Sequence, residues 1–184
     1  AMGGGVLLTG SNAKFDKVRI SGNRSAYGGG IGLQGDSNLT VNDSEIADNF
    51  AFERGGGLAT GNFFATTSPA LIRFGTGVRM SGNMAELGGG IAIGAGTELE
   101  IAPNPLVQGG TLLAIEGNEA NGNGGGLWVA SAVGTIPAGI LNATGLGVRI
   151  NVAGKTGGGL YSLGRAVVRD REFAFNHADN DGGG

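Results

Sequence analysis

The feature that most constrains the fold of this chain is a run of three glycines that occurs seven times. Successive runs begin 25, 27, 33, 36, 33 and 25 residues apart. An asparagine lies five or six positions before each run after the first, and an apolar residue lies three positions before each asparagine. The six asparagines are Asn23, Asn49, Asn83, Asn118, Asn151 and Asn176. Six units with this pattern predict a solenoid in which each unit forms one coil.

Short segments of alternating apolar residues predict strands along the units. One segment follows each glycine run, as in Ile31 and Leu33, a second lies in the middle of most units, and a third ends near the asparagine. Alternation with a period of two is typical of a strand with one buried face. The frequent glycines would each cost a helix about 1 kcal/mol. Three strands per unit therefore predict an all-β fold, a parallel β-helix of about six coils, as a single domain over residues 1–184.

Stacked coils would place the asparagines one above another at a corner of the column. Each side-chain amide can then donate a hydrogen bond to the next side-chain carbonyl, at a gain of about 1 kcal/mol per bond. Asparagine also tolerates the left-handed backbone of a sharp corner, and we expect the glycines to form tight turns at the opposite corner. An alanine follows each asparagine where the cross-section is expected to be narrow: Ala26, Ala51, Ala85, Ala120, Ala153 and Ala178.

The third, fourth and fifth units are longer than the others, and their surplus lies at residues 61–69, 103–110 and 130–139. Insertions in a solenoid form loops on the side of the column and often its binding face. A second candidate surface is the outward column after the glycine runs, which we expect to be flat and apolar: Leu7, Gly32, Ala59, Ala92, Trp128 and Tyr161. The candidate binding residues on these two features are Phe63, Phe64, Leu106, Val107, Trp128 and Tyr161.

The composition argues against several classes of chemistry. The chain has no cysteine and a single histidine, His177, so a Cys-based zinc site, a His-based metal triad and the usual Ser-His-Asp triad cannot be assembled. A net charge of -3 without long basic runs argues against nucleic acid as a partner. No apolar run is long enough to cross a bilayer. We therefore expect no catalytic residue, no metal, no cofactor and no membrane insertion of this segment.

The repeat resembles that of the polymorphic outer membrane proteins of bacteria, which are known for paired FxxN and GGA[ILV] motifs. The match is literal at Phe173-Ala174-Phe175-Asn176, and Gly-Gly-Gly stands here in place of Gly-Gly-Ala. The resemblance covers nearly the whole chain. It implies a right-handed parallel β-helix from a secreted or outer membrane-associated, autotransporter-like surface protein. The implied role is structural or adhesive and non-enzymatic, with a protein or glycan on a host or neighbouring cell as partner.

Two other functions stay open at the level of sequence. Parallel β-helices also host pectate-lyase-like and polysaccharide-binding proteins, and such lyases need clustered carboxylates for calcium and a basic residue to abstract a proton. Glu45 has a structural explanation instead, because Arg19 and Arg79 are expected beside it in the adjacent coils as a charge ladder. Ice binding is a weaker alternative, since the outward column carries no threonine.

The chain begins and stops close to glycine runs, in the same phase of the repeat. A column cut in this phase exposes the unpaired backbone groups of a whole coil at each end. We therefore expect the chain to be a fragment of a longer protein, or to associate end to end with copies of itself.

Overall fold

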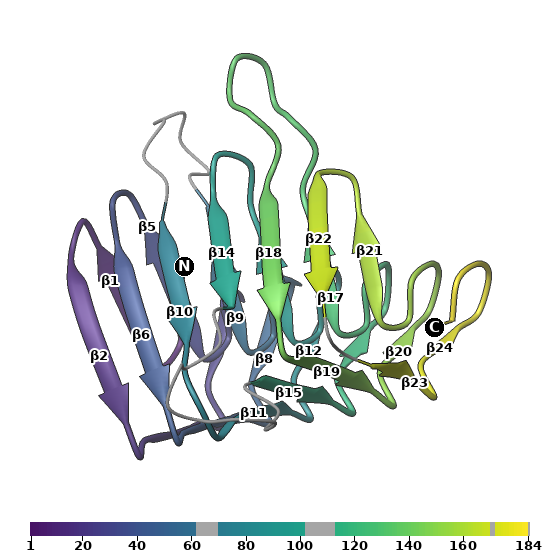
Figure 1. The fold of residues 1–184 in the computed structure, drawn as a ribbon, viewed down its shortest axis with the longest axis horizontal. Coiled ribbons are helices and arrows are strands. Elements are labelled where there is room, and N and C mark those ends of the chain that lie inside the picture. The colour runs from purple at the N-terminus through teal and green to yellow at the C-terminus, as the bar shows by residue number, and fades with distance from the viewer. Residues whose placement is uncertain (62–69, 102–112, 170–171, 184) are drawn as a thin grey trace.

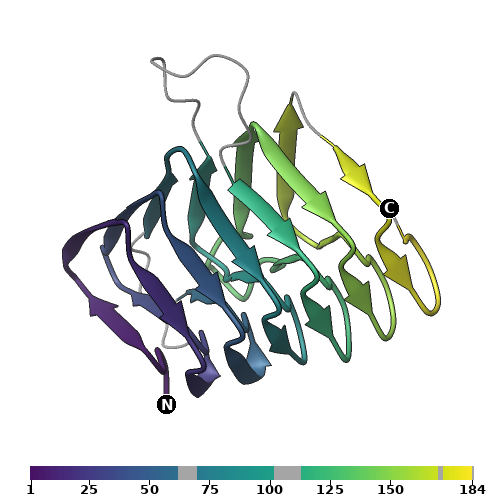
Figure 2. The same ribbon diagram turned by 90° about the horizontal axis from the view of Figure 1, so that it is seen from below.

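The computed structural model describes residues 1–61, 70–101, 113–169 and 172–183 (Figure 1). Within these ranges the chain forms 24 strands and no helix. The strands form four sheets of six, and the pairings between neighbouring strands are parallel. Each strand pairs with the strand four places further along the chain, so four successive strands make one coil (Figure 2). This arrangement is a parallel β-helix of about six coils, as the sequence predicted.

The four sheets take their order from the position of their strands in each coil. The first sheet, after the glycine runs, contains β1 (Val6–Thr9), β5 (Ile31–Gln34), β9 (Leu58–Thr60), β13 (Ile91–Ile93), β17 (Leu127–Val129) and β21 (Leu160–Ser162). The second contains β2 (Asn12–Asp16), β6 (Asn38–Asn42), β10 (Leu71–Phe74), β14 (Glu98–Ile101), β18 (Ile140–Thr144) and β22 (Arg165–Arg169). The third contains β3 (Arg19–Ser21), β7 (Glu45–Ala47), β11 (Val78–Ser81), β15 (Leu113–Glu116), β19 (Leu146–Arg149) and β23 (Phe173–Ala174). The fourth contains β4 (Arg24–Tyr27), β8 (Phe50–Arg54), β12 (Met84–Ala85), β16 (Glu119–Ala120), β20 (Val152–Ala153) and β24 (His177–Ala178).

The fourth strand of each coil was not predicted from the sequence, which indicated three. It follows the asparagine, and from the third coil onward it contains only two residues. Two residues are too few to show an alternating pattern. The strand β18, which begins directly after the insert at residues 130–139, was missed as well.

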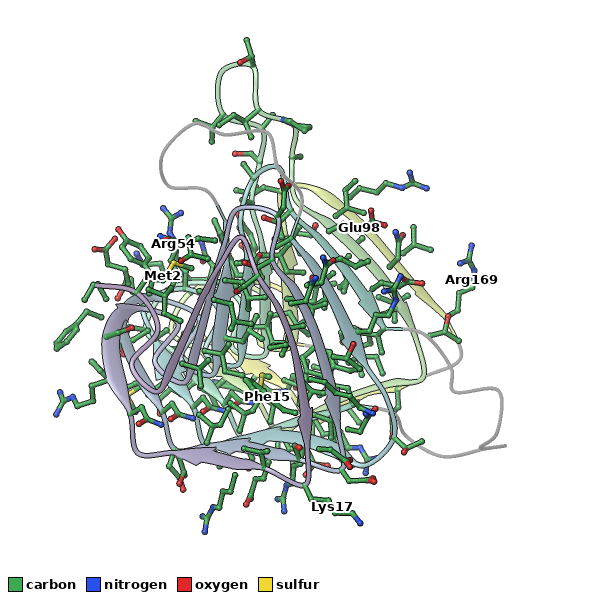
Figure 3. The ribbon with its side chains drawn as sticks, turned by 90° about the vertical axis from the view of Figure 1, so that its left-hand side faces the viewer. Met2, Phe15, Lys17, Arg54, Glu98 and Arg169 are labelled. Atoms are coloured by element: carbon green, nitrogen blue, oxygen red, sulfur yellow. The ribbon has the colours of Figure 1, made fainter. Side chains whose placement is uncertain are left out.

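The inward side chains of the first three sheets form one continuous apolar core that extends from the first coil to the last. In the second sheet, Leu39, Ile72, Leu99 and Leu141 follow one another in register. Each of these four side chains is at most 1% exposed. Figure 3 shows Phe15 pointing into this interior, while Lys17 at the corner of the same coil points outward. The alternation read from the sequence therefore assigned the inward face correctly.

Small residues line the inward side of the fourth sheet, as predicted, with one correction. Ala51 pairs in register with Ser25 and not with Ala26. The buried hydroxyl of Ser25 donates to the carbonyl oxygens of Tyr27 and Gly28, at 2.6 and 3.1 Å. Serine is therefore accepted in this narrow position because its hydroxyl is satisfied locally.

Each position of a glycine run leaves no room for a Cβ, as residues 28–30 illustrate. Gly28 has a φ of 60°, and a Cβ there would lie 2.1 Å from the carbonyl oxygen of Ile31. A Cβ on Gly29 would lie 2.4 Å from the carbonyl oxygen of Phe50 in the next coil. A Cβ on Gly30 would lie 2.7 Å from the carbonyl oxygen of Gly57 in the next coil and 3.0 Å from the side-chain Nδ2 of Asn49. The runs therefore lie beside the asparagines, and their predicted position at the opposite corner was wrong.

The left-handed residue at the asparagine corner is the residue before the asparagine and not the asparagine itself. All six positions have φ between 55° and 71°: Gly22, Asp48, Gly82, Gly117, Ile150 and Phe175. The left-handed region is unfavourable for residues that carry a Cβ, above all for β-branched ones. The last two coils therefore carry backbone strain at Ile150 and Phe175, whose side chains are 60% and 85% exposed.

Replacing Ile150 with glycine is expected to stabilise the protein by about 1 kcal/mol. The left-handed conformation costs an L-residue about 1–2 kcal/mol, and glycine adopts it without this cost. Part of the gain is offset because glycine loses more backbone conformational entropy on folding. Little burial is lost, because the Ile150 side chain is mostly exposed. Ile150→Ala is the matched control, since it removes the same exposed side chain and keeps the Cβ. Chemical denaturation should rank Gly above Ala, and equal stabilities would contradict the strain assigned here.

Candidate functional site

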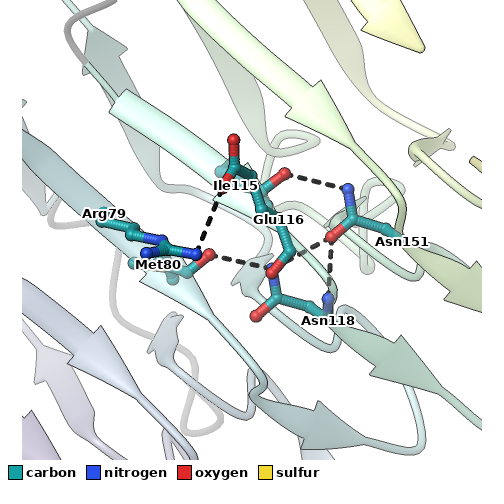
Figure 4. Close-up of polar contacts among 6 residues, drawn as sticks. All are labelled: Arg79, Met80, Ile115, Glu116, Asn118 and Asn151. Atoms are coloured by element: carbon teal, nitrogen blue, oxygen red, sulfur yellow. Dashed lines mark hydrogen bonds and ion pairs between the residues drawn. The ribbon is translucent and has the colours of Figure 1, made fainter. Parts of the chain in front are cut away.

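The six predicted asparagines form a continuous ladder of hydrogen bonds. The Nδ2 of each of the first five donates to the Oδ1 of the asparagine in the next coil, at 2.9–3.0 Å. The backbone N–H of each donates to the same Oδ1, at 3.0 Å. From the second coil onward, the other Nδ2 hydrogen reaches the carbonyl oxygen of the apolar residue that starts the motif one coil earlier. Figure 4 shows this pattern, with Asn118 donating to Met80 and to Asn151.

The ladder thus makes more bonds than the single bond per coil that the sequence suggested. In Asn49, Asn83, Asn118 and Asn151, both amide hydrogens and the carbonyl oxygen have partners, and the side chains are at most 1% exposed. A buried amide with every group satisfied is neither titratable nor open to a ligand. The chemical role of this column is therefore to hold successive coils in register.

The charge ladder predicted around Glu45 is present only in part. Arg19 and Arg79 flank Glu45 in register, and Arg19 Nε lies 3.1 Å from Glu45 Oε2. Arg79, however, makes its ion pair with Glu116 of the following coil, at 3.5 Å (Figure 4). The charges therefore form separate pairs in place of a continuous Arg-Glu-Arg ladder. Because the arginine side chains are 64% and 59% exposed, each pair contributes little to stability.

The predicted outward column through Trp128 and Tyr161 exists in register, but it is not a flat exposed surface. Trp128 is only 6% exposed and packs with Ala59, Ala92 and Ala130 in a second apolar cluster. Tyr161 is half-buried against the same cluster. Trp128 therefore presents no open ring for stacking, whereas a binding role of Tyr161 stays a prediction.

The residues that cover this column precede the glycine runs. Tyr27, Arg54 and Leu87 each stand directly before a run, and bridges join them from coil to coil. Tyr27 and Leu87 pack against the second apolar cluster, and the Arg54 guanidinium carbon lies 5.0 Å from the centre of the Trp128 ring. Figure 3 places Arg54 and Met2 on this side of the coil. The large side chain before several of the runs was the sequence signal that could have revealed this cover.

Tyr27 also takes part in a hydrogen bond that affects its titration. Its hydroxyl donates to the Glu53 carboxylate, and this bond raises the pKa of Tyr27 above its ordinary value. Partial burial and the negative charge of Glu53 act in the same direction. The phenol therefore stays protonated at neutral pH, and Glu53 is engaged as its acceptor.

The inserts can be placed only in part. Phe63, Phe64, Leu106 and Val107 lie outside the described residues. The third insert, residues 130–139, forms a loop closed at its base by a hydrogen bond from Gly139 N to Ala130 O, at 3.0 Å. An antiparallel bridge joins Val133 and Ile136 near its tip, where Val133 is 61% exposed. Figure 1 shows this loop rising above β18, which confirms that the third insert projects from the coil.

The outer face of the fourth sheet carries exposed apolar residues that the sequence analysis did not single out. Arg24, Phe50 and Met84 occupy one column in register, and Phe52 follows on the same strand as Phe50. Phe52 is 61% exposed and Met84 is 36% exposed. The alternation of Phe50 and Phe52 was the available signal, although it lay in the strand that was not predicted.

Groups suited to metal or acid–base chemistry are dispersed in the described ranges. No cluster of three or more His, Cys, Asp or Glu side chains that could hold a metal ion occurs there. His177 Nε2 lies 3.2 Å from Asp179 Oδ1 in an exposed pair on the last coil. The described part of the chain also contains no helix of the length and apolar character that a membrane crossing needs.

Comparison with protein families, with curated proteins and with solved structures finds no match for this chain. The class of protein is therefore defined by the fold alone. It is a parallel β-helix with an internal asparagine ladder and loops that project from its side.

Proposed function

We propose that this chain is a non-enzymatic structural and adhesive β-helix segment of a secreted or cell-surface bacterial protein. The observation that carries the proposal is the projecting loop at residues 130–139, with its exposed apolar tip, on a column whose buried ladder asparagines are hydrogen-bonded. A rigid column of this kind can present loops at a fixed distance from its anchor. Its partner would be a protein or glycan on a host or neighbouring cell.

The repeat pattern supports a narrower proposal on the family. Phe173-Ala174-Phe175-Asn176 matches the FxxN motif of polymorphic outer membrane proteins, and in each coil the asparagine of this motif belongs to the ladder. The glycine runs stand here in the place of the second motif of that family, with Gly-Gly-Gly for Gly-Gly-Ala. We therefore propose a relationship to such autotransporter-like passengers, with a location at or beyond the outer membrane.

Shortening the projecting loop tests the adhesive role. A variant with residues 131–138 replaced by two glycines is expected to keep its circular dichroism spectrum, because the loop closes at its base outside the core. Fluorescent beads coated with this variant should bind epithelial or bacterial cells less than beads coated with the wild-type chain. Beads coated with heat-unfolded chain provide the background. Wild-type beads at background level on every cell type would contradict the proposed function, and a lost β spectrum would place the loop in the core.

A further inference from the structure

The exposed side chains of Arg24, Phe52 and Met84 and the half-buried ring of Phe50 form a surface, called here the Phe50–Phe52 patch. Phe50 and Phe52 lie on one face of β8 because alternate residues of a strand point the same way. Their ring centres are 5.0 Å apart and the rings are nearly perpendicular, at 87°. The patch thus offers two fixed aromatic surfaces on neighbouring positions of the rigid column.

Arg24 holds a cation over both rings. Its guanidinium carbon lies 4.9 Å from the centre of Phe50 and 5.7 Å from the centre of Phe52. Contacts at these distances orient the guanidinium through its attraction to the ring faces. The exposed arginine is therefore positioned by the patch although it is free to meet a ligand from solvent.

Arg24 lacks an acidic partner in the described residues, as do Arg165 and Arg169, whereas four other arginines have one. Arg19, Arg73, Arg79 and Arg149 each make an ion pair with a glutamate. In the described part of the chain no carboxylate lies within ion-pair distance of Arg24. The glutamate on the neighbouring strand, Glu53, accepts the hydroxyl hydrogen of Tyr27. The planar guanidinium of Arg24 is thus available to donate hydrogen bonds to a carboxylate from outside the protein.

The size and charge of the patch indicate its ligand. A stable protein interface needs about 20–30 residues on each side, whereas this patch has four side chains. A polyanion would meet a chain with a net charge of -3, which disfavours ligands with many negative groups. A sugar ring with one carboxylate fits both features, because its C–H face can pack on an aromatic ring while its carboxylate meets one guanidinium.

We propose that the Phe50–Phe52 patch binds a glycan that ends in a sugar acid with a single carboxylate. The proposal rests on the adhesive function and assigns a ligand class to it. Arg24 receives the carboxylate, Phe52 packs against the sugar ring, and Phe50 keeps the guanidinium in place.

Binding of 3′-sialyllactose and of its carboxyl methyl ester, measured by calorimetry or NMR titration, tests the site. The wild-type chain should prefer the acid by about tenfold, since one charged hydrogen-bonded pair distinguishes the two probes. Arg24→Gln should bind both probes equally, and Phe52→Ala should weaken both. Arg73→Gln is the control, because it removes an exposed arginine that already has a partner, and it should behave as wild type.

A wild-type chain that binds neither probe, or an Arg24→Gln variant that keeps the preference for the acid, overturns the site. The cell-binding assay with coated beads separates this result from failure of the adhesive function. Beads that bind cells while the chain ignores both probes would leave the adhesive function standing without this site. Binding of sialyllactose by a chain whose beads do not adhere would support the site and contradict the adhesive role.

Discussion

Replacing Gly89 with alanine is expected to destabilise the protein by more than about 4 kcal/mol, so that little folded protein is recovered. A Cβ at this position would lie 2.3 Å from the carbonyl oxygen of Glu119 and 2.6 Å from that of Gly125, both in the next coil. These are backbone atoms in a close-packed stack, so relief requires the two coils to separate locally. Soluble yield and thermal unfolding followed by circular dichroism measure the effect.

Gly117→Ala provides the matched control for this effect. Gly117 has a positive φ, of 61°, which Gly89 does not have, and no atom lies within 4 Å of its added Cβ. The expected cost is therefore the left-handed strain alone, about 1–2 kcal/mol. If the two variants unfolded within about 1 kcal/mol of each other, close contact between coils would not be the reason for the second glycine of each run.

Replacing Asn83 with alanine is expected to cost about 3 kcal/mol. The change removes the acceptor of both the backbone N–H and the side-chain amide of Asn49. It also removes the donor to the carbonyl oxygen of Ile46 and to Asn118. Each buried polar group left without a partner costs about 1–3 kcal/mol, although local relaxation recovers part of the sum. For a chain of this size, the melting temperature should fall by about 6–12 °C.

Asn121→Ala is the control that tests whether the stability lost in Asn83→Ala comes from the ladder hydrogen bonds. Asn121 is exposed in the coil of Asn118, and its side chain makes no hydrogen bond to the described residues. The substitution keeps the backbone bond from residue 121 to Ala85, so its cost should be below about 0.5 kcal/mol. Similar melting temperatures for the two variants would contradict the role assigned to the ladder.

The repeat made most of the coil predictable from sequence. The motif of apolar residue, asparagine and glycine run occurs six times. It therefore indicated the number of coils, the ladder residues and the inward face of the strands. Ile72 and Leu99, for example, were assigned to the core from alternation alone, and both are fully buried. The core depends on side-chain period, which a sequence displays directly.

Details of the corners and the outer faces were not predictable in the same way. The left-handed residue at each asparagine corner could not be assigned without backbone torsions. Ile150 has a left-handed φ although β-branched residues disfavour that conformation. Trp128 in the fifth coil is contacted by Arg54 of the second coil, and only the stacking of the coils brings these two residues together. The Phe50–Phe52 patch lies in a strand too short elsewhere in the repeat to be recognised. These features arise between coils, so no single unit contains them.

The asparagine-to-asparagine bonds of the ladder also have a direction, since each of the five runs from a side-chain Nδ2 to the Oδ1 of the coil that follows in sequence. A duplicated unit inserted at any point would find an acceptor on one side and a donor on the other. Loss of a whole unit would likewise leave its two neighbours with matching groups. Gene duplication and deletion can therefore change the length of such a column in steps of one strand spacing, about 4.8 Å, without a compensating mutation. Evolution can in this way adjust the reach of the protein independently of the loops that it carries.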